Sequence, residues 1–167
     1  MQKNNDNIVA RHVLDINIQN EISSFGVEQK MNDYIGMQKV VLPELEKQGL
    51  FREVINKESG MIIEITKKGI KETFGSGNRF QSLPRKLKEL KIATLRNLPE
   101  IIQEAHLVKD NVLNFHGNAA EYAYLALEVD INGLFAQVRI DVKKTPAKNK
   151  FWLHMIDINE KNPITQP

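Results

Sequence analysis

YAYLALEVDINGLFAQVRIDVKK, residues 122–144, is the stretch that decides how the second half of this chain folds. Two runs of alternating apolar and polar residues flank Asn132-Gly133. This pair is typical of a two-residue type I′ hairpin turn, because both positions need a positive φ. A turn placed there brings four apolar pairs onto one face: Ile131 with Leu134, Val129 with Ala136, Leu127 with Val138 and Leu125 with Ile140. The stretch therefore predicts an antiparallel hairpin with one buried face.

The opposite face of the same hairpin collects polar residues. Its pairs are Asp130 with Phe135, Glu128 with Gln137, Ala126 with Arg139 and Tyr124 with Asp141. Arg139 is therefore diagonal to Glu128 and to Tyr124. The last apolar run, FWLHMIDI at residues 151–158, predicts a neighbouring antiparallel strand. If Phe151, Leu153 and Met155 join the core, His154 lies on the face of Arg139, whereas Ile156 and Ile158 fall on the His154 side.

The remaining sequence predicts an α+β fold with N-terminal helices packed on a C-terminal antiparallel β-meander. The predicted elements are a strand within residues 10–18, a helix over 25–48 capped by Ser23 or Ser24, a hairpin over 51–66, a helix over 67–74, helices from Pro84 and from Asn97, and a hairpin turn at Asp110-Asn111. Residues 1–8 are polar and expected to be disordered. Residues 9–158 are expected to form one domain, divided into parts 9–60 and 61–158, and residues 159–167 a polar tail.

Composition excludes several classes of function. The 167 residues are enough for one domain with a core, and the net charge of +2 gives no general argument for nucleic-acid binding. Residues 67–96, however, carry nine Lys and Arg against two Glu, which favours either phosphate attraction or a solvated helix face. The chain has no cysteine, so disulfides, thiolate metal sites and a cysteine nucleophile are excluded. The sequence shows no signal peptide and no apolar run long enough to span a bilayer, so we expect a cytoplasmic protein, or one delivered to a target-cell cytoplasm, with no membrane partner.

Four segments, IEITKKGIKETFGSG (63–77), LPEIIQEAHLV (98–108), EVDINGLFAQVRIDVKK (128–144) and FWLHMIDI (151–158), carry a family resemblance. Residues 61–158 resemble a domain of large polyvalent proteins from phages and conjugative elements. That domain is similar to the Barnase–EndoU–colicin–RelE group of metal-independent ribonucleases. The family often has a Ser-His pair after the Lys-Gly helix, whereas this chain keeps Ser76 without the histidine. The resemblance implies a ribonuclease-like fold and cleavage of RNA, with transfer RNA as one candidate substrate and a cognate immunity protein as a partner of a toxin.

The residues expected to carry such chemistry follow from the resemblance and the shared face. The predicted catalytic residues are Arg139, His154 and Glu128; the predicted RNA or phosphate contacts are Lys68, Lys71, Thr73, Ser76, Tyr124 and His116. In this hypothesis Glu128 or Lys71 assists deprotonation of the 2′-hydroxyl, Arg139 binds the scissile phosphate and His154 protonates the leaving oxygen. No cofactor and no metal are expected, because the sequence holds no metal-ligand motif.

Each of these residues also has a structural interpretation. Arg139 could instead form an ion pair with Glu128, His154 could pack beside Trp152, and His116 could be a turn residue. Tyr122, Tyr124 and Trp152 could stack on bases or simply pack in the sheet. The alternative function is therefore a catalytically inactive accessory module of the same fold, which binds a protein partner through residues 25–60. An immunity protein is a weaker alternative, because such proteins usually present an acidic surface and this chain is slightly basic.

Overall fold

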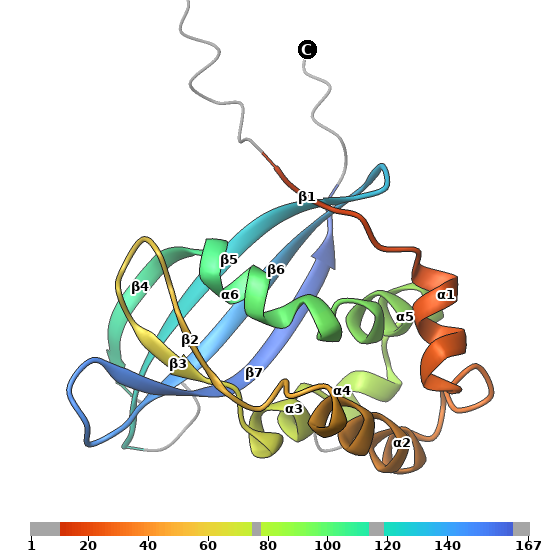
Figure 1. Cartoon of the computed structure of the whole chain (residues 1–167), viewed down its shortest axis with the longest axis horizontal. Helices are drawn as coiled ribbons and strands as arrows, with labels where there is room; N and C mark the ends of the chain where they lie inside the picture. The colour runs from red at the N-terminus through yellow and green to blue at the C-terminus, as the bar shows by residue number, and fades with distance from the viewer. Residues whose placement is uncertain (1–10, 75–77, 114–118, 162–167) are drawn as a thin grey trace, which may run out of the picture.

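A computed structural model describes residues 11–74, 78–113 and 119–161 of the chain (Figure 1). The elements are β1 (His12–Leu14), α1 (Ile18–Phe25), α2 (Tyr34–Lys47), β2 (Glu53–Ile55), β3 (Ile62–Glu64), α3 (Lys67–Thr73), α4 (Asn78–Gln81), α5 (Arg85–Ala93), a 3-10 turn (Leu95–Asn97), α6 (Leu98–Glu104), β4 (His106–Leu113), β5 (Glu121–Ile131), β6 (Leu134–Lys144) and β7 (Lys150–Glu160). Among these described elements, no helix is both long and apolar enough to cross a membrane.

The sheet is mixed, with the strand order β1-β5-β6-β7-β3-β2 and with β4 on the same edge of β5 as β1. Strands β4 to β7 pair antiparallel, but β1 runs parallel to β5 and β3 runs parallel to β7. The α+β class is therefore confirmed. The C-terminal antiparallel meander is also present as β4 to β7, and strands from the N-terminal part extend it at both sides into a mixed sheet.

The central hairpin has the predicted turn and register. Asn132 and Gly133 have φ values of 52° and 91°, and every predicted pair from Ile131–Leu134 to Tyr124–Asp141 is present. Leu125, Val138 and Ile140 are fully buried in the hydrophobic core. The local chemistry of one Asn-Gly pair thus sets which side chains of both strands face the core.

The helix predicted over residues 25–48 is wrong in its first part. Helix α1 ends at Phe25 and is followed by Gly26, which adopts the left-handed conformation with φ of 73° that commonly terminates helices. The chain becomes helical again only at Tyr34, where the side chain of Asp33 accepts a hydrogen bond from Gly36 N. The cap of α1 is Asn17, so neither Ser23 nor Ser24 has the predicted role.

The hairpin turn predicted at Asp110-Asn111 is also wrong. Strand β4 runs continuously along β5, and its register shifts between Leu107 and Lys109 and again between Lys109 and Val112. Asn111 does take a positive φ, 55°, as a turn residue would. In this strand the positive φ accompanies an irregularity in the ladder rather than a chain reversal.

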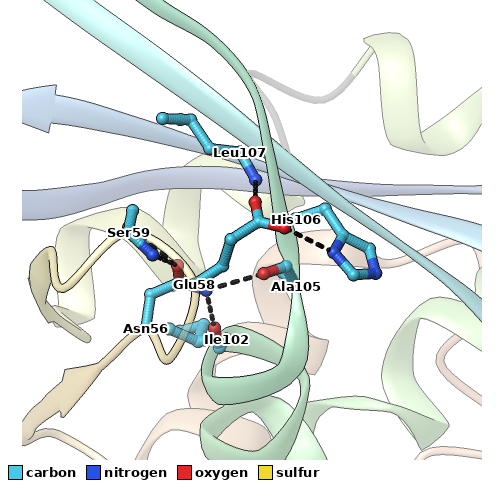
Figure 2. A network of polar contacts seen from close by, with 7 residues as sticks. All are labelled: Asn56, Glu58, Ser59, Ile102, Ala105, His106 and Leu107. Carbon is cyan, nitrogen blue, oxygen red and sulfur yellow. Dashed lines mark hydrogen bonds and ion pairs between the residues drawn. The ribbon is translucent and has the colours of Figure 1, made fainter.

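The turn between β2 and β3, at one edge of the sheet, contacts the end of α6 and the start of β4 at the other edge (Figure 2). Asn56, which follows β2 and is fully buried, donates from its amide to Ile102 O and Ala105 O, each at 2.8 Å. Glu58 accepts from Leu107 N at 2.7 Å, at the start of β4. The two Asn56 bonds satisfy carbonyls at the end of α6, where the last carbonyls of a helix lack partners within it, and the Glu58 bond satisfies an N–H of β4. The sheet therefore curls toward α6, with the helices and the core on its inner side (Figure 1).

Candidate functional site

The outer face of β5, β6 and β7, turned away from α6, is more than a solvated surface. Tyr122 is 1% exposed and Met155 is 9% exposed, yet neither belongs to the main core cluster. Tyr122 alternates with the inward-facing Ala123, and Met155 is paired with Asp141, so both side chains lie on the outer face. This outer face thus holds a second small group of packed side chains.

His154 is the extra residue of a β-bulge. Val142 of β6 pairs with Leu153 and Asp141 pairs with Met155, so His154 has no partner of its own in the register. Bulges of this kind redirect a side chain and often occur beside functional sites. His154 lies with its ring edge-to-face against Tyr122, with 5.1 Å between the ring centroids.

The bulge corrects the predicted faces of the last strand. Phe151 and Leu153 belong to the core as expected, but Ile156 and Ile158 also belong to it, whereas Met155 lies outside it. The side-chain alternation changes at His154, because the inserted residue moves every later side chain to the opposite face. His154 nevertheless lies on the outer side, where its ring contacts Tyr122.

Helix α3 covers the bulge. Strand β3 pairs with β7 only as far as Trp152, and beyond that point hydroxyls of α3 take over. Thr66 Oγ1 donates to Leu153 O at 3.4 Å, and Thr73 Oγ1 accepts from Ile156 N at 3.1 Å. A side chain at Gly69 would overlap the Leu153 carbonyl, so this glycine permits the close approach.

Between α3 and the bulge lies a pocket of about 460 Å³. Its lining residues are Thr66, Lys68, Glu72, Tyr122, Lys143, Trp152, Leu153 and His154. The volume is within the range of sites that hold small organic ligands. The pocket joins α3 and its cap residue Thr66 to three neighbouring strands, so residues distant in sequence meet in one recess.

The lining of the pocket carries unneutralised positive charge. Neither Lys68 nor Lys143 forms an ion pair with any residue that the structure describes, although Glu72 follows Lys68 by four positions on the same helix. Glu72 is the one carboxylate in the described lining. Within the described ranges, no three His, Asp or Glu side chains gather closely enough to hold a metal ion. Two cations and one carboxylate leave the recess suited to an anionic ligand.

Arg139 lies on the same outer face but is not part of the pocket lining. Its guanidinium stacks 4.2 Å from the ring centroid of Tyr124, and its Nε donates to Asp141 Oδ1 at 2.9 Å. Glu128 instead accepts a hydrogen bond of 2.7 Å from Gln137. The ion pair considered between Arg139 and Glu128 is therefore replaced by one between Arg139 and Asp141.

The predicted phosphate contacts are scattered. Lys68 lines the pocket, whereas Lys71 is exposed on α3 outside the lining. Thr73 is 2% exposed, and its hydroxyl donates to Gly69 O and accepts from Ile156 N. Tyr124 packs against Arg139. Ser76 and His116 lie outside the described residues.

Sequence reasoning missed Lys143 and Glu72 as site residues. The signal for Lys143 was present, because the hairpin register extended by two residues places it opposite Tyr122. Glu72 could have been found from its spacing, since positions i and i+4 lie on one face of a helix. The site therefore combines two predicted residues, His154 and Lys68, with two others, Lys143 and Glu72, that strand register and helical spacing could have predicted.

Comparison with known proteins gives one match. Residues 38–152 match the model of the family described as Large polyvalent protein-associated domain 3. No curated protein and no solved structure matches the chain. The matched region begins within α2 and ends at Trp152, so it includes α3 and most of the pocket but stops two residues before His154. Because the match spans more than half of the sequence, the chain belongs to the Large polyvalent protein-associated domain 3 family.

Proposed function

We propose that this protein is a ribonuclease-like domain that binds RNA in the α3–β7 pocket and cleaves it by metal-independent transesterification. The observation that carries the proposal is the meeting in one recess of a bulge histidine, a carboxylate and two lysines that form no ion pair with a described residue. Further support comes from the resemblance of residues 61–158 to a polyvalent-protein domain that is similar to the Barnase–EndoU–colicin–RelE ribonucleases. Because one fold can serve many functions, the proposed activity depends on the side chains of the site rather than on the fold.

Each charged side chain of the pocket has a role in this reaction. The 2′-oxygen of a ribose attacks the adjacent phosphorus, Glu72 accepts the 2′-hydroxyl proton, and a 2′,3′-cyclic phosphate forms. The bond from phosphorus to the 5′-oxygen breaks as protonated His154 donates a proton to that oxygen. Lys68 and Lys143 stabilise the charge that develops on the phosphoryl oxygens. Glu72 replaces Glu128 as the base, because Glu128 is hydrogen-bonded to Gln137 away from the lining.

The test is RNA cleavage by the purified chain in the presence of EDTA. We expect products ending in 2′,3′-cyclic phosphate and no cleavage of an oligonucleotide whose sugars lack the 2′-hydroxyl. His154→Ala should lower the rate about 100- to 10,000-fold, since that is the usual contribution of a general acid or base. The matched control is His106→Ala, because His106 is an exposed histidine on β4 that contacts Glu58 rather than the pocket. Unchanged cleavage by His154→Ala, or a strict requirement for divalent metal, contradicts the proposal.

The biological setting follows from this chemistry. We propose a toxin or effector of a mobile element that acts on RNA, with transfer RNA as one candidate, in the cytoplasm of the producing cell or of a target cell. Expression should then arrest growth, and co-expression of a cognate immunity protein should restore it. Harmless expression at high level, together with RNA binding but no cleavage, identifies the second candidate.

The second candidate is an accessory module that binds RNA without cutting it. One observation favours it: Arg139, the expected phosphate clamp, is held by Tyr124 and Asp141 on the outer face. An arginine already stacked and ion-paired contributes less to a phosphate than an unpaired one. The cleavage assay separates the two candidates, because both bind RNA and only the first changes it.

A further inference from the structure

Trp152 is an exposed aromatic wall of the pocket. Its neighbours Phe151 and Leu153 are buried in the core, whereas Trp152 is 39% exposed. Trp152 is also the single tryptophan of the chain. In the described part of the molecule, neither an aromatic ring nor a cation lies against its indole. A large apolar side chain left open beside cations is a surface on which a planar ligand can stack.

Two lysines border Trp152 where they could contact the phosphate of a nucleotide whose base stacks on the indole. Lys143 is the cross-strand partner of Trp152 on β6, so their Cβ atoms are roughly 5 Å apart. Lys68 borders the same recess from α3. A base stacked on the indole would therefore place its phosphate within reach of two ammonium groups, with the His154–Tyr122 pair also in the lining.

The shape of the recess favours one state of RNA. A pocket of about 460 Å³ can hold a single nucleotide. In an A-form duplex the bases are stacked on one another, and their faces are not accessible to a side chain. Unpaired bases in loops, bulges and single strands can turn outward and stack on aromatic side chains.

We infer that the pocket recognises an unpaired nucleotide by stacking its base on Trp152, so that the substrate class is single-stranded or looped RNA. This inference rests on the proposed function, because it names the substrate of the same pocket. Base–aromatic stacking depends little on base identity, since every base has an aromatic face. The pocket therefore selects for unpaired structure more than for sequence.

The experiment uses the intrinsic fluorescence of Trp152, which reports on the pocket without a label. The probe is a short RNA with 2′-O-methyl groups, which cannot undergo transesterification, offered as a single strand and as a duplex of the same sequence. We expect the single strand to quench the fluorescence in a saturable way. The duplex should bind at least about 10-fold more weakly and leave the fluorescence unchanged.

Variants then identify the stacking group. Trp152→Leu should weaken single-strand binding about 10- to 100-fold, measured by anisotropy of a labelled probe, whereas Trp152→Phe should keep most of the affinity. Leu113→Ala is the matched control, because Leu113 is a large apolar residue of β4, 66% exposed, that is not part of the lining. Thermal unfolding of each variant shows that the fold is retained.

The outcomes separate this inference from the proposed function. Equal binding of duplex and single strand, or wild-type affinity in Trp152→Leu, overturns the stacking inference even when cleavage proceeds through His154. Absence of binding to any RNA overturns both. Single-strand binding with quenching but without cleavage supports the stacking inference and overturns the proposed catalysis.

Discussion

At the scale of single residues, Arg139 shows how an expected catalytic group can serve the fold. The carboxylate of Asp141 is 7% exposed on its side chain, and Arg139 donates to it from Nε. A carboxylate shielded from water needs a charged or hydrogen-bonding partner, because its desolvation is costly. The ring of Tyr124 holds the guanidinium plane in place. Arg139 therefore stabilises the outer face whether or not RNA is bound.

We predict that Arg139→Ala lowers the free energy of unfolding by about 1–3 kcal/mol. The value is below that of a fully buried ion pair, because the side chain of Arg139 is 36% exposed and water screens its charge. Arg139→Lys should recover only part of the loss, since lysine has no planar group to stack on Tyr124. Urea unfolding followed by circular dichroism measures the change.

The matched control for this prediction is Arg52→Ala. Arg52 is exposed and makes no side-chain hydrogen bond or ion pair with a described residue, so its replacement should change stability by no more than about 0.5 kcal/mol. Wild-type stability of Arg139→Ala, combined with loss of RNA binding, would show that Arg139 is a direct phosphate ligand instead.

Single residues also show which features of the site could be predicted from the sequence. The shared outer face of Tyr124, Glu128 and Arg139 was predictable, because the Asn132-Gly133 turn fixes it locally. The hydrogen-bond partners of these residues were not predictable. Glu128 bonds to Gln137 and Arg139 to Asp141 because of side-chain geometry rather than register. Face membership follows from period-two patterning, whereas hydrogen-bond partners depend on rotamers that a sequence pattern does not encode.

At the scale of elements, α3 and the bulged part of β7 form one unit. Helix α3 supplies the hydrogen bonds of Thr66 and Thr73 to β7, and Gly69 lets the two backbones approach. A glycine within a helix normally lowers helix stability by roughly 0.5–1 kcal/mol relative to alanine. The presence of glycine at this position is therefore explained by the contact rather than by the helix.

We predict that Gly69→Ala destabilises the protein by about 1–3 kcal/mol, against the usual gain for such a change in a helix. The new methyl group would lie under 3.0 Å from the Leu153 carbonyl oxygen, so α3 has to move away from β7. That movement opens the pocket, and single-strand RNA binding should weaken together with stability. Chemical denaturation and the Trp152 fluorescence titration measure the two effects.

Gly36→Ala is the matched control, because Gly36 also lies in the first turns of a helix. There the added methyl group would meet the end of the Asp33 side chain, whose carboxylate accepts a hydrogen bond from Gly36 N and can rotate away at the cost of this cap. A stability change within about 1 kcal/mol, with RNA binding unaffected, is expected. If Gly69→Ala behaved like Gly36→Ala, the close packing of α3 on the bulge would not be what holds the pocket together.

Elements differ in how far their own sequence determines them. The central hairpin was predictable because its turn residues and its alternation agree. The break after α1 was not, since Val27 and Met31 are buried from a non-helical segment at a spacing that resembles the helical period. The bulge at His154 was not predictable either, because it depends on the pairing with β6 and on α3 rather than on β7 alone.

At the scale of the whole molecule, the curled sheet is closed by contacts between distant segments. The amide of Asn56 bonds carbonyls 46 and 49 positions away in sequence, and Lys57 N donates to Gln103 O at 3.0 Å. Local sequence patterns could predict the turn that ends at Gly60, but they could not predict that this turn contacts the end of α6. Such long-range pairings, like the parallel pairing of β1 with β5, are set by the assembled core.

We predict that Asn56→Ala lowers the free energy of unfolding by about 2–4 kcal/mol. The change removes two buried donors and leaves the carbonyls of Ile102 and Ala105 without the side-chain partners that Asn56 provides. It also removes the acceptor for the backbone and hydroxyl of Ser59, so the turn itself loosens. Because asparagine does not titrate, the loss measured by urea unfolding should be the same at pH 7 and at pH 4.

Glu58→Gln is the matched control in the same turn, and its effect should depend on pH. Hydrogen bonds from His106 and from Leu107 N lower the pKa of the exposed Glu58 below its ordinary value of 4.5. The contribution of the Glu58 carboxylate is therefore complete above about pH 4.5 and is lost as the pH falls through the lowered pKa. Glu58→Gln should be slightly less stable than the wild type at pH 7 and equal to it in strong acid. A loss as large as that of Asn56→Ala, or one that persists in acid, would mean that the surface contact rather than the buried amide closes the sheet.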